Sequence, residues 1–153
     1  MSKKLTQSDI ADIMADIDIC MMTTLAQDGK LESRPMSNNR DVRFDGDCYF
    51  FTHADTDVVK QLALKHEVNL SYVGSHSLFG LKKVYLSLAG EADMTTDRAI
   101  QEKHWVPDLE AWFSEGLDTP GLTLIHVQAR TVQYWDGMDG GVVSYNRARK
   151  LAA

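Results

Sequence analysis

Residues 104–137, HWVPDLEAWFSEGLDTPGLTLIHVQARTVQYWDG, decide the fold of this chain. They hold all three tryptophans and two of the three prolines, together with two strand-like runs. An indole ring buries a large apolar area, so tryptophans are rarely placed in exposed loops. Such a segment forms either a corner of the core or a wall against a flat ligand, and the rest of the chain favours the second interpretation in part.

The remainder of the chain consists mostly of strand-like segments joined by short turns. QDGK at 27–30 and DGD at 45–47 are typical of hairpin turns, and Gly90 inside a long strand indicates a β-bulge. The last two strands are expected to pair as another hairpin. The predicted strands are 19–26, 31–39, 48–52, 67–73, 83–94, 121–127 and 131–135.

Helical patterns occupy the spaces between groups of strands. Residues 8–18 carry apolar side chains at helical spacing after Ser8, a good N-cap. A second helix is expected to begin at 55–56 and a third at 95–96, and Pro107 ends the third or opens a short fourth. Strands dominate and helices do not alternate with them. The sequence therefore predicts a mainly β fold with peripheral α-helices, built on a closed antiparallel sheet.

The length and composition predict one domain over 1–153, with helix 8–18, a barrel over about 19–137 and a tail over 138–153. The chain has 44% hydrophobic and 25% charged residues, as soluble globular proteins do. No apolar run is long enough for a membrane helix, and the N-terminus lacks the apolar stretch of a signal peptide. A cytoplasmic location is expected.

The net charge of −6 disfavours nucleic acid and anionic membranes as partners. Cys20 and Cys48 lie in apolar runs without a CxxC pair, so they are expected to be small buried side chains. The five histidines form no metal-ligand spacing, and no metal is expected. The chain also lacks a G-x-S-x-G motif.

Arg34, Thr52 and Thr56 are the candidate anion site. If the second and third strands pair across the turn at 45–47, Arg34 comes close to Thr52, and Thr56 begins the following helix. A guanidinium, two hydroxyls and a helix N-terminus suit a phosphate dianion. Pro35 indicates an irregular edge whose free backbone groups suit the polar rim of an isoalloxazine. Two alternatives stay open: Arg34 as a solvated strand residue and Thr56 as a helix cap alone.

An ordered set of motifs extends this interpretation. The chain resembles the general stress protein branch of the pyridoxamine 5'-phosphate oxidase-like flavin-binding split barrels, over about 18–137. The segments that carry the resemblance are SRPMS (33–37), YFFTHADT (49–56), VNLSYV (68–73), VYLSLAGEADM (84–94), HWVP (104–107), AWFSEGLDTPGLTLIHV (111–127) and YWDG (134–137).

The resemblance implies a six-stranded split barrel that forms a homodimer with FMN in two clefts at the subunit interface. By this resemblance Arg34 contacts the phosphate, and the backbone after it lines the flavin ring. By the same resemblance Trp105 and Trp112 wall the cleft, from the partner subunit. The cofactor-binding residues that it implies are Arg34, Pro35, Met36, Ser37, Phe51, Thr52, Thr56, Trp105 and Trp112. FAD and a deazaflavin stay open as alternatives to FMN, as does haem.

The chain departs from the family pattern at Val58, where the family often has a lysine. Lys60 is two residues further along the helix and is turned by about 200°. The phosphate site therefore loses one cationic contact, on the order of 1 to 3 kcal/mol if that hydrogen bond is charge-assisted.

Two functions agree with these residues. One is a flavin-dependent oxidoreductase, in which the cofactor supplies hydride chemistry and the protein supplies orientation. The other is a non-catalytic flavin-binding or stress-response protein. Oxidation of pyridoxamine 5'-phosphate itself is not expected, because Trp135 and Arg147 are weak counterparts of the substrate motif. The catalytic residues stay unknown, and the basic tail receives no function.

Overall fold

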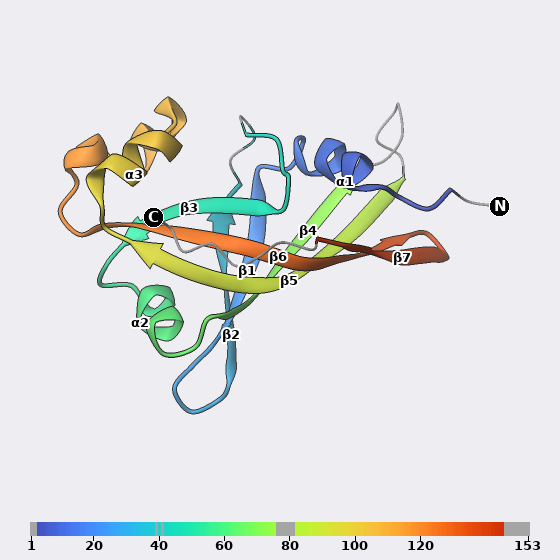
Figure 1. Ribbon diagram of the computed structural model, residues 1–153, viewed down its shortest axis with the longest axis horizontal. Coiled ribbons are helices and arrows are strands. Elements are labelled where there is room, and N and C mark those ends of the chain that lie inside the picture. The colour runs from blue at the N-terminus through green and yellow to red at the C-terminus, as the bar shows by residue number, and fades with distance from the viewer. Residues whose placement is uncertain (1–2, 39, 41, 76–81, 146–153) are drawn as a thin grey trace.

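A computed structural model describes residues 3–38, 40, 42–75 and 82–145 of the chain (Figure 1). Its strands form one antiparallel, seven-stranded sheet in the order β2-β1-β4-β5-β6-β3, and β7 also pairs with β6. The strands are β1 (Ile19–Leu25), β2 (Leu31–Ser37), β3 (Asp47–His53), β4 (Glu67–Ser75), β5 (Lys83–Thr95), β6 (Leu122–Asp136) and β7 (Asp139–Ser144).

The helices lie at the two ends of this sheet. Figure 1 shows α1 near β7 at one end, and α2 and α3 at the other. The helices are α1 (Gln7–Met14), α2 (Asp57–Leu64) and α3 (Arg98–His104), followed by the 3₁₀ turns η1 (Pro107–Ala111) and η2 (Gly116–Asp118). We call the segment from α3 to η2, residues 98–118, the α3 segment.

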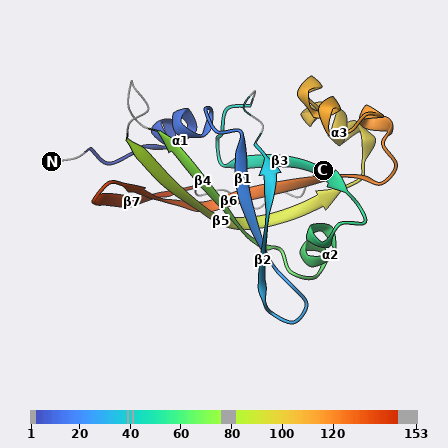
Figure 2. The same cartoon turned by 180° about the vertical axis from the view of Figure 1, so that it is seen from behind.

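The sheet curls into a barrel that stays open along one side. β2 and β3 end the strand path, and in the described part of the chain β2 pairs with β1 and β3 with β6. Figure 2 shows the β1–β2 hairpin crossing β5 and β6 at a steep angle. The mainly β, antiparallel split-barrel fold expected from the sequence is confirmed, with β7 as an additional strand.

The expected pairing of the second and third strands is wrong. Each edge strand finds its partner elsewhere, so the turn at 45–47 does not close a hairpin. Gly46 instead accepts a hydrogen bond from the backbone of Ala129, at 2.8 Å. The space between β2 and β3 is therefore left to side chains, and this is where the split of the barrel lies.

The expected terminal hairpin of 121–127 and 131–135 is also wrong, because β6 is one long strand. Ala129 pairs with Gly90, where β5 carries the predicted bulge. A Cβ on Gly90 would lie 2.2 Å from the carbonyl oxygen of Gln128, so only glycine permits this approach. The hairpin forms between β6 and β7 instead. There Gly141 packs so close to Tyr134 that a Cβ would lie 2.5 Å from the phenol oxygen.

The helix boundaries differ slightly from those expected. Thr6 caps α1 in a reciprocal capping box with Asp9, so the helix begins before Ser8 and ends at Met14. Thr56 is the N-cap of α2, as predicted, whereas Asp97 rather than a threonine caps α3. Part of the tail, including the basic residues of 147–150, lies outside the described residues.

Two apolar clusters hold the fold together. The larger fills the barrel and includes Leu62 and Leu88, both fully buried, as well as both cysteines. The smaller lies between the α3 segment and strands β3 and β6, around Phe51, Phe113 and Leu124. The burial expected for Cys20 and Cys48 is confirmed, and it raises the pKa of the Cys20 thiol to about 11. No helix in the described ranges is long and apolar enough to span a membrane.

Candidate functional site

An open cleft of about 630 Å³ lies where the barrel is split, between the edges of β2 and β3 and against the α3 segment. Small-molecule sites commonly have volumes of about 300–1,000 Å³ and mostly apolar walls. The cleft has both aromatic walls and polar groups. Its lining residues are Asp18, Ile19, Pro35, Met36, Ser37, Asn38, Arg40, Tyr49, Phe50, Phe51, Thr52, His53, His104, Val106, Asp108, Leu109, Trp112 and Phe113.

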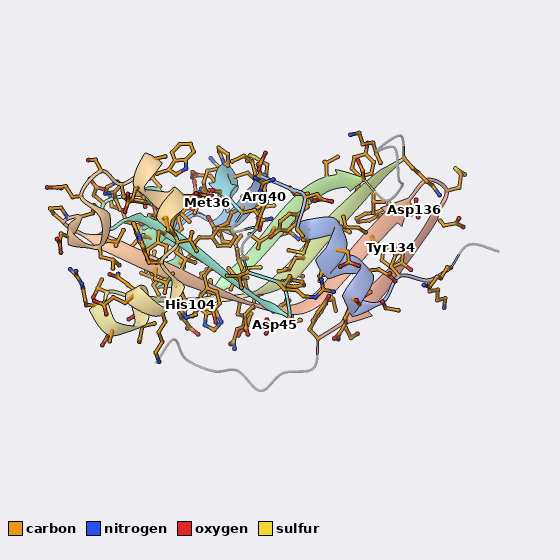
Figure 3. The ribbon with its side chains drawn as sticks, turned by 90° about the horizontal axis from the view of Figure 1, so that it is seen from above. Met36, Arg40, Asp45, His104, Tyr134 and Asp136 are labelled. Carbon is orange, nitrogen blue, oxygen red and sulfur yellow. The ribbon has the colours of Figure 1, made fainter. Side chains whose placement is uncertain are left out.

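Most of the residues predicted from the sequence meet in this cleft. Figure 3 shows Met36 and His104 toward the end of the molecule that carries α3, and Tyr134 toward the opposite end. The predicted residues that line the cleft are Pro35, Met36, Ser37, Phe51, Thr52 and Trp112. Arg34, Thr56 and Trp105 are described by the structure but lie outside this lining.

Arg34 is half-buried and held by hydrogen bonds to β1 and α2 rather than solvated on the strand. Its Nη1 donates to the Thr24 hydroxyl and to the carbonyl oxygen of Met22, and its Nη2 donates to Oε1 of Gln61, at 3.0 Å. Thr24 also donates to Gln61, and both are buried. Partial burial lowers the pKa of Arg34, against the opposing effect of Glu32 and Asp57. An arginine nevertheless keeps its charge in proteins.

The two threonines lie at the start of α2. The Thr52 and Thr56 hydroxyl oxygens are 3.4 Å apart, and Thr56 Oγ1 also donates to the carbonyl oxygen of His53. Thr56 makes no side-chain capping bond to its own helix, so its hydroxyl is turned toward Thr52. The first backbone N–H groups of a helix attract anions.

Arg34 reaches α2 by a different route from the one expected. The contact runs through Gln61, about one helical turn after Asp57, and not through pairing of β2 with β3. The guanidinium is thus attached to α2, the helix whose N-terminus is the candidate anion site. The bonds within the described residues use Nη1 and one hydrogen of Nη2, which leaves Nε and the second Nη2 hydrogen as donors for a ligand.

Val58 faces the barrel core with only 4% of its surface exposed. The position at which the family often has lysine therefore provides no cation to the cleft. Asp57, which precedes it, adds an acidic charge in the first turn of the helix. An anion bound near the start of α2 would depend on Arg34, two hydroxyls and the helix N-terminus.

The two tryptophans take different positions. Trp112 remains 66% exposed while it lines the cleft of its own chain. Trp105 packs edge-on against Phe51, at 5.1 Å between ring centroids, and against Phe113, at 6.1 Å. Trp105 thereby fixes the α3 segment to β3, and Trp112 is the indole that walls the cleft.

Sequence reasoning missed a column of rings at the aromatic end of the cleft. The Tyr49 ring is stacked between His104, at 3.7 Å and 14°, and His126, at 4.7 Å and 9°. His126 is 6% exposed, and its Nε2 lies 3.0 Å from Oδ1 of Asp47. The tyrosine and both histidines come from β3, α3 and β6, so no spacing along the chain could have revealed them.

Arg40 was also missed, as a cation of the cleft lining. Its Nε forms an ion pair with Oδ1 of Asp18 at 2.9 Å, and both side chains are more than half exposed. In Figure 3 Arg40 lies close to Met36, which places this pair beside the β2 wall. The described residues contain no group of three or more metal-ligating side chains.

The family model of the pyridoxamine 5'-phosphate oxidase like proteins matches residues 6–152. The chain belongs to this family. The family recognised from the sequence motifs is therefore confirmed, over nearly the full length of the chain.

The individual relatives share little sequence identity with this chain. The protein bli-3 of Neurospora crassa is 27% identical over 136 residues, which cover 83% of this chain and 63% of bli-3, so the chain spans less than two thirds of that relative. A Clostridium acetobutylicum protein related to general stress protein 26 has a TM-score of 0.75 at 20% identity, covering 90% of this chain and 93% of that one.

Two further solved structures have the same fold. General stress protein 26 of Bacillus anthracis has a TM-score of 0.70 at 19% identity and covers 91% of this chain and 98% of its own. A heme binding protein of Mycobacterium smegmatis has a TM-score of 0.64 at 13% identity, and the match covers 94% of this chain and 60% of that protein. At these identities the comparisons establish a shared fold and do not identify a ligand for this chain.

Proposed function

We propose that this protein binds FMN in the cleft between β2 and β3 and acts as a flavin-dependent oxidoreductase. The observation that carries the proposal is the division of the cleft into two ends. Thr52 lines the end of the cleft next to α2, Thr56 lies beside it, and Arg34 is joined to α2 through Gln61 outside the lining, whereas aromatic and apolar side chains line the remainder. An anionic phosphate tail and a flat ring need this combination.

The residues present fit the cofactor. Pro35 removes one backbone donor from β2, and Met36 and Ser37 line the cleft on a strand that ends the sheet path among the described strands. Free edge groups are suited to the polar rim of a flavin ring. Phe51 and Trp112 provide apolar surface on the opposite side. A bound flavin would supply the hydride chemistry, and the protein would supply binding and orientation.

The binding test compares FMN with riboflavin, which lacks the phosphate. The purified, flavin-free chain is titrated with each ligand, and flavin fluorescence reports the affinity. FMN is expected to bind more tightly. Arg34→Gln should reduce the affinity for FMN by about 10- to 100-fold, equivalent to 1.4–2.8 kcal/mol, and leave riboflavin unaffected.

Arg130→Gln is the matched control, because Arg130 pairs with Glu67 at an exposed position. Equal affinity of the wild-type chain for FMN and riboflavin would contradict the phosphate site. FAD and a deazaflavin are compared in the same titration. Bleaching of the bound flavin by NADPH, followed by recovery with an acceptor, separates an oxidoreductase from a non-catalytic flavin-binding protein.

The protein is also proposed to be a homodimer. Supporting this, the outer face of the sheet exposes apolar side chains on neighbouring strands: Val73 of β4 pairs with Tyr85 of β5, which pairs with Trp135 of β6. These three side chains are 55%, 51% and 41% exposed. Contiguous apolar surface of this kind marks interfaces.

Sedimentation of the wild-type chain and two variants tests the dimer. Tyr85→Glu should yield a monomer, because it places a charge within the apolar face. Leu64→Glu, which changes an exposed leucine at the end of α2, should not alter the mass. A wild-type monomer at micromolar concentration would contradict the proposal.

A further inference from the structure

The column Asp47–His126–Tyr49–His104 has no role in binding a phosphate, yet it ends at the cleft. Tyr49 and His104 line the cleft, whereas His126 lies beneath them against the sheet. On β6, His126 pairs with Tyr49 of the neighbouring strand β3 and with Asp93 of the other neighbouring strand, β5. The strands therefore fix the column from both sides.

The inner half of the column is rigid. Asp47 accepts a hydrogen bond from Nε2 of His126, and no described residue bonds to the buried Nδ1 of His126. A buried N–H without an acceptor is costlier than a bare lone pair, so the favoured tautomer has its proton on Nε2, facing Asp47. This bond fixes the plane of the imidazole, and the plane of Tyr49 lies within 9° of it.

The outer half of the column presents an imidazole to the cleft. His104 is the last residue of α3, and its ring lies flat on Tyr49. Stacking on a fixed ring restricts its rotation, while its edge remains partly exposed. Imidazole is the side chain that most readily gives and takes protons near neutral pH.

Building on the proposed flavin function, we propose that His104 exchanges a proton with the electron acceptor in this cleft, and that Tyr49 positions it. The acceptor class is a planar conjugated carbonyl compound such as a quinone, because the cleft combines flat apolar walls with an imidazole that stacking holds in place. A bound flavin would supply the hydride, taken from a reduced nicotinamide, and protonated His104 would supply the proton that the carbonyl oxygen needs. Neutral His104 then takes a proton from water.

The surroundings of His104 make its protonated form a stronger acid. Burial lowers the pKa of His104 below its ordinary value of 6.5, His126 and Lys103 lower it further, and Asp47 acts in the opposite direction. His104 is thus a proton donor that returns readily to its neutral form. The titratable groups around the column are Asp47 and Tyr49 of β3, His126 of β6, Asp93 opposite it on β5, and Lys103 of α3; His53 and Asp108 line the same cleft.

The first test needs no flavin. NMR follows the imidazole titration of His104 in the free chain, with and without hydroquinone as the probe. A phenol that donates to the neutral imidazole should stabilise that form, so hydroquinone should lower the measured pKa of His104. An unchanged titration at saturating hydroquinone would overturn the proposal, whether or not the chain binds FMN.

The second test uses the FMN-loaded chain, reduced with NADPH and mixed with p-benzoquinone at several pH values. The rate should fall as the pH rises through the His104 pKa measured by NMR. His104→Phe keeps a ring on Tyr49 but has no proton to exchange, and should be about 100-fold slower at low pH and independent of pH. His66→Gln removes an imidazole that does not line the cleft, and this variant should have the rate and pH profile of the wild type.

A wild-type pH profile in His104→Phe would show that the ring serves packing alone and would overturn the proposal while FMN binding persists. A chain that binds no FMN would instead refute the proposed function. The two failures are therefore distinguishable, because the first leaves the protein yellow and the second leaves it colourless.

Discussion

α2 and α3 lie at the same end of the sheet and are fixed in different ways (Figure 1). α2 places Leu62 in the large barrel cluster, and its Gln61 joins a side-chain network with Thr24 and Arg34. α3 belongs to the small cluster, and its Gln101 donates to the backbone oxygen of Leu122, at 2.8 Å. The difference indicates that the anion end is part of the barrel itself, whereas the aromatic end is a smaller unit laid on top of it.

The largest expected contrast comes from truncating one large side chain in each cluster. Leu62→Ala should lower the free energy of unfolding of the whole chain by about 2–5 kcal/mol, because its partners fill the barrel. Phe113→Ala removes the buried ring that Trp105 and His53 contact. Its effect should concentrate in the α3 segment as local opening.

Hydrogen exchange distinguishes the two variants. Amides of β4 and β5 should lose protection in Leu62→Ala and keep it in Phe113→Ala, in which the amides of 98–118 exchange faster. Equal loss across the sheet in both variants would mean that the α3 segment and the barrel unfold as a single unit, contrary to the comparison above.

The two buried glutamines provide the next contrast. Gln61→Leu and Gln101→Leu should each lower the free energy of unfolding by about 1–3 kcal/mol, because each leaves a buried polar partner unsatisfied. Only Gln61→Leu frees the guanidinium of Arg34, so only this variant should reduce the preference for FMN over riboflavin. Urea unfolding and paired flavin titrations measure both effects, and a reduced preference in Gln101→Leu would contradict the assignment.

The sequence predicted one end of the cleft better than the other for a physical reason. Pro35, Thr52 and Thr56 belong to short local patterns, a strand edge and a helix start, which survive the wrong pairing of β2 with β3. Gln61 and Thr24, which hold Arg34, lie at ordinary helix and strand positions, and only their burial reveals them. Tyr49, His104 and His126 meet through tertiary packing, and the continuous β6 brings His126 there.

A smaller effect is expected from the acidic residue at the start of α2. Asp57 lies in the first turn of α2, and its charge raises the pKa of Arg34, so it would oppose a phosphate bound beside that guanidinium. Asp57→Asn should strengthen FMN binding by about 2- to 5-fold, equivalent to about 0.4–1 kcal/mol, and leave riboflavin unchanged. Asp12→Asn on α1 is the control, since Asp12 pairs with Arg43 away from the cleft. Tighter binding of both flavins would point to a general charge effect instead.

The smallest effect concerns pH and the aromatic end. The pKa of His104 is lowered in the folded chain, so the unfolded chain binds more protons between that value and about 6.5. The free energy of unfolding should therefore rise with pH through this window and gain nothing further from His104 above it. His104→Phe should reduce that slope, as urea unfolding at pH 5 and pH 7.5 would reveal. An identical slope in the variant would mean that folding leaves the protonation of His104 unchanged, and Tyr49 would then hold an imidazole no different from one in water.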